Sequence, residues 1–227
     1  MITSAANPRL KLVRRLEGRR QRDKLGLFVC EGEDLVEAAR SQGIEPIDLL
    51  VAGESVEPAL LAAVSTLAHP PRVVGVFRRA DLPAYEPRPV GLALWHVGDP
   101  GNVGTLVRSA DAYGASVALS AGCADPTGPK ALRASAGAIF RVPAGRFDEV
   151  TGHRVALVAR GGEPLPKVAL REGTVFVLGA EREGLPEDVV ATCDAVASIP
   201  VAETAESLNV AIAGAIALYE WSRRRSG

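Results

Sequence analysis

The second half of the chain alternates short apolar runs with helical patterns, and this alternation restricts the fold more than any other feature of the sequence. The expected strands are Leu92–Val97, Ser116–Ser120, Arg154–Ala159, Thr174–Leu178 and Ala195–Ile199. The expected helices are Asn102–Tyr113, Pro129–Ala136, a short one at Glu187–Ala191, and Ser207–Arg224. Strands that are apolar along their whole length predict a mostly parallel sheet with helices on both faces, so the expected fold class is α/β.

The first half alternates too, and a proline-rich segment separates it from the second. Its expected strands are Leu27–Glu31, Ile47–Val51 and Val73–Phe77, and its expected helices are Asn7–Lys24, Glu33–Ser41 and Glu57–Leu67. Pro83, Pro87 and Pro89 follow within seven residues, and prolines fix an extended backbone and remove hydrogen-bond donors. The sequence therefore predicts a first domain at 1–79, a linker at 80–90 and a second domain at 91–227.

Charge is distributed unevenly along the chain. Its 227 residues carry 26 Lys and Arg against 27 Asp and Glu, and a net charge of −1 argues against a nucleic-acid-binding protein. Residues 1–24, however, hold eight Lys and Arg against two acidic residues, which gives +6 and leaves −7 for the rest. The basic first helix is either a solvated face or a surface that contacts phosphates.

Several classes of protein are disfavoured. The apolar stretch Val210–Trp221 is too short to span a bilayer, and no secretory signal is visible, so we expect a cytoplasmic protein. The three cysteines are too widely spaced for a disulfide framework or a zinc ribbon. His69, His96 and His153 lack metal-ligand spacing, so no metal is expected, and there is no G-x-S-x-G hydrolase motif.

Ligands of parallel sheets bind beyond the carboxyl ends of the strands, and the loop Gly98–Arg108 lies at one such end. Its glycines do not match the dinucleotide or Walker phosphate motifs. Asn102 could simply cap the following helix. Arg108 lies about two turns into a helix that we expect to be largely covered, so it should need a carboxylate or phosphate partner.

Two further loops follow strands. In Leu178–Pro186, Gly179 and Gly184 flank the carboxylate of Glu181, either as a capped turn or as part of a site. In Ile199–Asn209, a polar loop enters a helix of small apolar residues. Its Ser207 and Asn209 are good helix caps, but they could equally hold a ligand.

Together the three loops resemble the three motifs of the SpoU/TrmH family of RNA ribose methyltransferases, in the SPOUT superfamily. Asn102, Gly104 and Arg108 match N-x-G-x-x-x-R; Leu178, Gly179, Glu181 and Gly184 match L-G-x-E-x-x-G; Ile199, Pro200, Ser207, Leu208 and Asn209 match I-P followed by S-L-N. The first half resembles the substrate-binding domain of this family, a small RNA-binding α/β module, through Ile2–Ser4, Asn7-Pro8 and Leu27–Gly32. Val201, Glu203 and Thr204 depart from the third motif, in which many members have methionine and glycines.

This resemblance implies a C-terminal trefoil knot, S-adenosylmethionine as cofactor and a homodimer with the final helix in its interface. The cofactor-binding residues would be Leu178, Gly179, Gly184, Ile199, Pro200 and Leu208. The catalytic residues would be Asn102, Arg108, Glu181, Ser207 and Asn209, four of which would shape the pocket and orient Arg108 and the cofactor. The RNA-binding residues would be Arg14, Arg15, Arg19 and Arg20.

The implied reaction is attack by a ribose 2′-hydroxyl on the sulfonium methyl group. A guanidinium is almost never deprotonated, so we assign Arg108 to clamping the adjacent phosphate and assign no proton acceptor. Ribosomal RNA of the 23S type is the favoured substrate. The alternatives are a tRNA 2′-O-methyltransferase, a non-catalytic RNA-binding protein on a methyltransferase scaffold, and an enzyme with another methyl acceptor.

Overall fold

The computed structural model describes residues 1–225, and its larger sheet has seven strands, all parallel. The strand order is β6-β5-β4-β9-β7-β10-β8. These strands are β4 (Val90–Leu94), β5 (Ser116–Leu119), β6 (Ala144–Arg146), β7 (His153–Leu157), β8 (Glu163–Pro164), β9 (Thr174–Leu178) and β10 (Ala195–Ser198). The predicted parallel α/β sheet is confirmed. The sequence did not predict β6 and β8, because runs of two or three residues carry no periodic signal.

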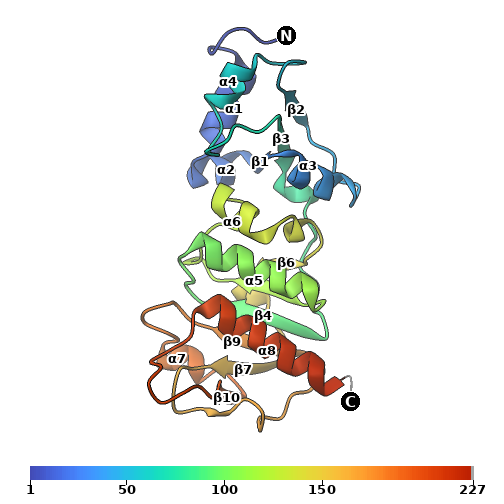
Figure 1. The fold of residues 1–227 in the computed structure, drawn as a ribbon. Coiled ribbons are helices and arrows are strands. Elements are labelled where there is room, and N and C mark those ends of the chain that lie inside the picture. Colours follow the sequence, from blue (N-terminus) through green and yellow to red (C-terminus); the bar gives the residue numbers. More distant parts are fainter. Residues whose placement is uncertain (226–227) are drawn as a thin grey trace.

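Helices cover both faces of this sheet, as predicted. They are α5 (Pro100–Ala112), α6 (Pro129–Ser135), α7 (Glu187–Val190) and α8 (Val210–Arg225). On one face α5 lies between α6 and α8, and on the other face Val189 of α7 packs with the strand residues Ala93 and Val177 (Figure 1). No helix within residues 1–225 is both long and apolar enough to cross a membrane.

Glycines allow these helices to approach one another closely. A Cβ atom on Gly104 would lie 2.3 Å from the carbonyl oxygen of Ala131, where α5 meets α6. A Cβ atom on Gly214 would lie 2.4 Å from a methyl group of Leu106, where α8 meets α5. The motif glycine Gly104 therefore serves helix packing.

The first part of the chain forms a separate antiparallel sheet of three strands. Its order is β1-β3-β2, with β1 (Leu27–Glu31), β2 (Asp48–Val51) and β3 (Val73–Arg78). Its helices are α1 (Pro8–Leu16), α2 (Arg19–Leu25), α3 (Glu33–Arg40) and α4 (Pro58–Ala62). It lies at the opposite end of an elongated molecule from the C-terminal helix α8 (Figure 1).

Three predicted helices differ by several residues from those observed. The single helix expected at Asn7–Lys24 is wrong, because Gly18 is extended and divides it into α1 and α2, as glycine's low helix propensity permits. The helix α4 ends at Ala62, and the following Ser65 and Thr66 bond to the carboxylate of Glu31 instead of continuing it. The last helix begins at Val210.

One hydrophobic core cluster contains residues of both sheets. Phe28 of β1 and Phe77 of β3 stack with ring centroids 5.8 Å apart, and Phe140 lies 5.8 Å from Phe77. Beside this cluster, Asp125 accepts hydrogen bonds of 2.7 Å from Arg22 and 2.6 Å from Arg79. The proline segment is therefore not the only connection between the two sheets, since a packed and charged interface also joins them.

Candidate functional site

A cavity of about 570 Å³ opens at the carboxyl ends of β7, β9 and β10. Apolar side chains and backbone form much of its wall, including Leu157, Leu178, Gly179, Ile199, Leu208 and Val210. Parallel strands end at the same edge of a sheet, so loops that are distant in sequence meet there. This is the place expected for a ligand of this fold.

Most of the residues predicted to bind a cofactor line this cavity. They are Leu178, Gly179, Gly184, Ile199 and Leu208. Glu181, Ser207 and Asn209, predicted as catalytic residues, also line it. Pro200, Asn102 and Arg108 are not among the residues that line it, so their predicted roles stay predictions.

One side of the cavity is formed by a segment that the sequence did not single out. The segment Leu157–Arg160 lies at the end of β7, which is between β9 and β10 in the sheet, and it lines the cavity together with the motif loops. Its strand was predicted, and the rule that ligands bind beyond carboxyl ends applies to it equally. The segment was overlooked because it carries no motif residue.

The loop after β9 is tight, and its glycines are required for steric reasons. A Cβ atom on Gly179 would lie 2.2 Å from the carbonyl carbon of Gly184. Gly184 has φ +69°, which favours glycine. Ala180 and Gly184 exchange backbone hydrogen bonds of 3.1 and 2.9 Å. The turn therefore brings bare backbone to the cavity and presents Glu181 beside it.

A chain of hydrogen bonds connects the three motif loops. The Asn102 amide donates to Glu181 Oε1 at 2.9 Å, and the Asn209 amide donates to Asn102 Oδ1 at 3.0 Å. Glu181 also accepts from the backbone N–H groups of Gly98 at 3.3 Å and Asp99 at 3.2 Å. Burial acts to raise the pKa of Glu181, but these hydrogen bonds outweigh it and hold the pKa below its usual value.

The helix caps differ in part from those that the sequence suggests. Asp99, not Asn102, caps α5, and its carboxylate accepts from the Asn102 backbone at 3.0 Å and from Lys130 at 2.8 Å. The bond from Lys130 is the main cause of the lowered pKa of Asp99. Asn209 caps α8 by accepting from the Ala211 backbone at 2.9 Å, in addition to its bond to Asn102.

Arg108 lies on an exposed stripe of α5, although its neighbours Leu106 and Val107 are fully buried. Most of α5 is covered, as expected, but the face that carries Arg108 is exposed in the single chain. Within residues 1–225, Arg108 has no ion pair or hydrogen bond, and the hydrogen bonds among Glu181, Asn102 and Asn209 do not orient it. Ser207 likewise lines the cavity without a hydrogen bond to another described residue.

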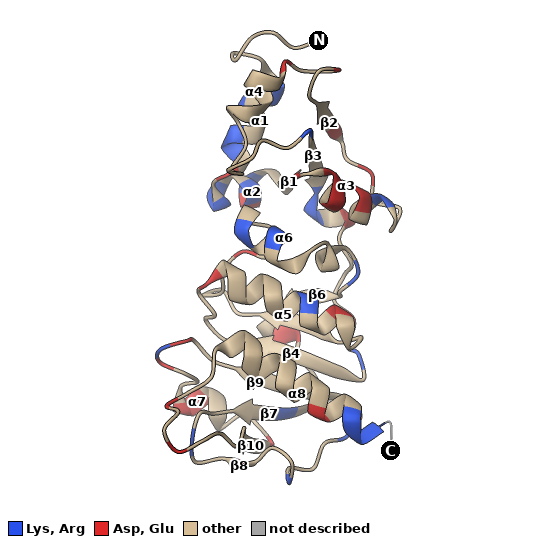
Figure 2. Cartoon of the chain, in the orientation of Figure 1, with Lys and Arg blue, Asp and Glu red and all other residues tan. Residues whose placement is uncertain are grey.

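The four predicted RNA-binding arginines are exposed on two short helices. Arg14 and Arg15 lie in the last turn of α1, and Arg19 and Arg20 begin α2. Arg15 donates to Gln21 at 3.1 Å, and Arg19 donates to the carbonyl of Cys123 in the other half of the chain at 2.8 Å. Figure 2 shows basic segments on α1, α2 and α6 close to the junction of the two halves.

Comparisons with known proteins identify both halves of the chain. The model of the SpoU rRNA Methylase family matches residues 89–219, and the MRM3-like substrate binding domain matches residues 7–78. An uncharacterised tRNA/rRNA methyltransferase of Synechocystis is 32% identical and covers 99% of this chain and 94% of its own. The 23S rRNA (guanosine(2553)-2′-O)-methyltransferase RlmP of Bacillus subtilis is also 32% identical, over 96% of this chain and 97% of RlmP.

Solved structures agree with these sequence matches. The AdoMet-bound rRNA methyltransferase of Sinorhizobium meliloti superposes with a TM-score of 0.87 at 30% identity, covering 98% of this chain and 97% of that one. The SpoU methyltransferase AviRb of Streptomyces viridochromogenes, in complex with AdoMet, gives 0.86 at 28% identity, covering 97% and 99%. With a family model that matches more than half of its length and relatives that align over nearly all of it, this chain belongs to the SpoU rRNA methylase family.

Proposed function

We propose that this protein transfers a methyl group from S-adenosylmethionine to a ribose 2′-hydroxyl of ribosomal RNA, in the large-subunit 23S class. The observation that carries the proposal is the cavity, because residues from two motif loops and the loop after β7 form its wall. The AdoMet complexes of the S. meliloti and S. viridochromogenes relatives support the cofactor. The 2′-O-methyltransferase activity that names RlmP supports the acceptor.

The cavity suits this cofactor in size and chemistry. Its volume of about 570 Å³ lies in the usual range of ligand pockets, roughly 300–1,000 Å³. Leu157, Leu178 and Ile199 provide apolar surface for a purine, and Gly179 contributes backbone to the wall. When bound, S-adenosylmethionine supplies an activated methyl group whose leaving thioether is neutral.

The protein must then hold the acceptor hydroxyl in line with that methyl group. The hydrogen bonds among Glu181, Asn102 and Asn209 fix the loop that begins α5 against the loops at the cavity. Glu181 stays ionised there and accepts hydrogen bonds from Asn102, Gly98 and Asp99, so it acts as a rigid anchor of the site.

Arg108 contributes by binding RNA. Its guanidinium is exposed and has no acidic partner within residues 1–225, so it is free to bind a phosphate beside the target ribose. It cannot serve as the base, because a guanidinium keeps its protons.

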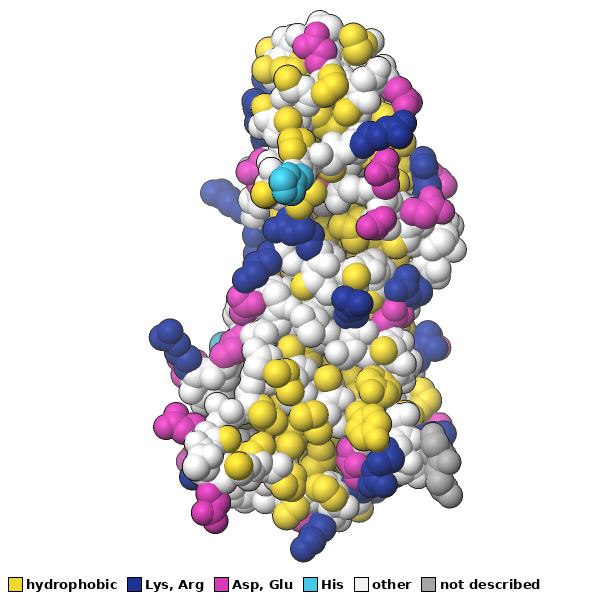
Figure 3. Space-filling model, in the orientation of Figure 1, with side chains coloured by type: hydrophobic (Ala, Val, Ile, Leu, Met, Phe, Trp, Pro, Cys, Tyr) yellow, Lys and Arg dark blue, Asp and Glu magenta, His cyan; other side chains and the backbone are white. Residues whose placement is uncertain are grey.

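A homodimer through α8 would complete the site. The inner face of α8 is buried against α5, whereas Ile212 and Tyr219 on its outer face are 52% and 55% exposed. Figure 3 shows hydrophobic side chains gathered over the lower half of this view. A second copy on this face would cover the surroundings of Arg108. Analytical sedimentation measures whether the protein is a dimer in solution. We also propose that the C-terminal part of this chain forms the trefoil knot that is known in similar enzymes.

We assign RNA selection to residues 1–79, the connection to 80–90 and the chemistry to 91–227, in a cytoplasmic enzyme. Arg14, Arg15, Arg19 and Arg20 would contact RNA phosphates. The bond from Arg19 to Cys123 and the shared core would keep these helices at a fixed distance from the site.

The test is incubation with tritiated S-adenosylmethionine and separated RNAs, followed by nuclease digestion. Label in a 2′-O-methyl nucleoside of 23S RNA is expected. Label in transfer RNA would favour the tRNA enzyme, and label on a base would change the acceptor. Failure to bind the cofactor would favour a non-catalytic RNA-binding protein.

A further inference from the structure

The cavity wall includes charged residues as well as apolar ones. Within residues 1–225 the cations that line it are Arg160 and Arg182, and the carboxylates are Glu181 and Glu183. Glu181 is already bonded to Asn102 and to the backbone of the α5 loop. A ligand with a carboxylate group therefore has two cationic side chains available in this cavity.

S-adenosylmethionine carries such a carboxylate, at the end of its amino-acid portion. Removing a carboxylate from water is costly unless a cation or several N–H groups replace the water. Arginine is well suited, because its planar guanidinium binds carboxylates with two parallel hydrogen bonds.

Arg160 is placed to provide this contact. It ends the segment that follows β7 and donates a hydrogen bond of 3.4 Å to the carbonyl of Ala205, in the loop after β10. Its side chain therefore reaches from one lining loop toward another. A guanidinium has five N–H groups, so this one bond leaves most of them free for a ligand.

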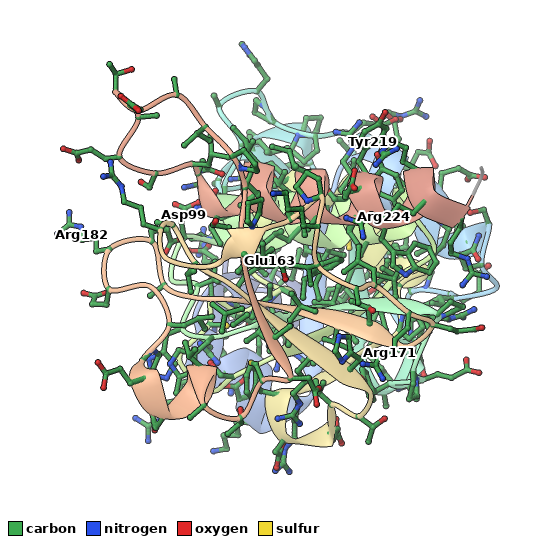
Figure 4. All side chains as sticks on the ribbon, turned by 90° about the horizontal axis from the view of Figure 1, so that it is seen from below. Asp99, Glu163, Arg171, Arg182, Tyr219 and Arg224 are labelled. Atoms are coloured by element: carbon green, nitrogen blue, oxygen red, sulfur yellow. The ribbon has the colours of Figure 1, made fainter. Side chains whose placement is uncertain are left out.

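Arg182 is a poorer candidate, although it also lines the cavity. It lies in the tight loop after β9, between Glu181 and Glu183, whose negative charges disfavour a ligand carboxylate beside it. Seen from below, Arg182 lies at the outer edge of the molecule and points away from the sheet (Figure 4).

We propose that Arg160 binds the carboxylate of the amino-acid portion of S-adenosylmethionine and so fixes that end of the cofactor. This inference rests on the proposed function, and it adds a contact from a loop that no motif marks. By holding the amino-acid end, Arg160 limits the positions that the sulfonium can take relative to the acceptor.

The test compares two neutral thioethers by calorimetry: S-adenosylhomocysteine, which has the amino-acid portion, and 5′-methylthioadenosine, which lacks it. Arg160→Ala is expected to lower the affinity for S-adenosylhomocysteine about 10-fold or more and to leave the affinity for 5′-methylthioadenosine unchanged. Arg160→Lys should recover part of the loss, since it keeps the charge. Lys167→Ala, which removes an exposed cation that does not line the cavity, is the control, with both affinities unchanged, and Arg182→Ala should show no selective loss of S-adenosylhomocysteine binding.

Several results would overturn the assignment. Equal weakening of both thioethers in Arg160→Ala would mean that Arg160 only supports the loop at Ala205. If Arg160→Ala weakened the binding of neither thioether, the carboxylate would bind elsewhere. The same would follow if Arg182→Ala selectively weakened the binding of S-adenosylhomocysteine. If the unsubstituted protein bound neither compound, the proposed function itself would fail, and this inference with it.

Discussion

Asn209 donates a hydrogen bond of 3.0 Å to Asn102, a residue 107 positions earlier in the chain. Asn102 in turn donates to Glu181 at 2.9 Å, so one polar chain crosses the carboxyl edge of the sheet. Each asparagine donates through its side-chain nitrogen and accepts through its side-chain oxygen, and with that oxygen Asn209 also caps α8. The first and third motifs thus meet directly through an asparagine pair, and the second joins them through a carboxylate.

The first prediction concerns Glu181. Glu181→Gln replaces one carboxylate oxygen with an amide donor. Oε1 accepts from Asn102 and Asp99 and Oε2 accepts from Gly98, so either replacement faces a donor group and the α5 loop should loosen. We expect methyl transfer to fall at least about 10-fold, as measured with tritiated cofactor. Glu183→Gln, in the same loop, is the control, and equal losses in both variants would contradict the anchoring role.

The same anchor predicts a pH dependence. The folded protein holds the pKa of Glu181 below its usual value, so the unfolded chain takes up this proton first as pH falls. Its contribution to stability is therefore complete above the ordinary glutamate pKa and is lost as pH falls through the lowered one. In acid unfolding, the free energy of unfolding should therefore fall less steeply with pH in Glu181→Gln than in the native protein.

The second prediction concerns Arg108. Arg108→Ala should abolish methyl transfer while cofactor affinity, measured by calorimetry, stays nearly unchanged. Because Arg108 is exposed and unpaired within residues 1–225, the melting temperature should also stay unchanged. A loss of cofactor affinity equal to the loss of activity would show instead that the residue is structural.

The sequence was sufficient for the parts of the fold that depend on local pattern. Apolar runs such as Thr174–Leu178 predicted buried parallel strands, because a strand covered on both faces has no polar side. The motif glycine Gly179 marked the cavity, since close backbone contact there excludes any side chain. Each of these signals is contained in a few consecutive residues, so the sequence alone is enough to reveal it.

Features that depend on distant partners could not be predicted. Nothing near Asn102 shows that Asn209 will reach it, and nothing near Leu157–Arg160 marks that segment as a cavity wall. The exposure of Arg108 was misjudged because buried neighbours on a helix do not bury its remaining face. The break at Gly18 was missed because basic residues continue across it, although the apolar positions end at Leu16.

The third prediction concerns the basic helices. Reversing Arg14, Arg15 and Arg20 to Glu should weaken RNA binding and lower its salt dependence by roughly 0.7–0.9 in log–log slope for each phosphate that the protein no longer binds. Arg19 is left intact because it donates to Cys123. Cofactor binding should stay unchanged. Reversing the exposed Lys167 and Arg171 is the control, and an equal change in slope there would contradict a local RNA surface.

The fourth prediction concerns the buried carboxylate of Asp125 at the junction of the two halves. Its side chain is 7% exposed and pairs with Arg22, which is 5% exposed, and with Arg79. Burial acts to raise the pKa of Asp125, but bonds from Thr127 and Arg22 outweigh it and lower the pKa. Asp125→Ala leaves two arginines without their partner and should cost about 3–5 kcal/mol in urea unfolding.

Folding lowers the pKa of Asp125, so the contribution of this carboxylate to the stability of the folded protein is complete above the ordinary aspartate pKa. That contribution is lost as pH falls through the lowered pKa. The native protein should therefore lose more stability on acidification than Asp125→Ala does. Asp148→Ala, which removes an exposed partner of Arg146, is the control and should unfold like the native protein. If Asp125→Ala also unfolded like the native protein, the Asp125 contacts would not stabilise the junction. Apolar packing and hydrogen bonds such as that from Arg19 to Cys123 would then hold α1 and α2 to the larger sheet.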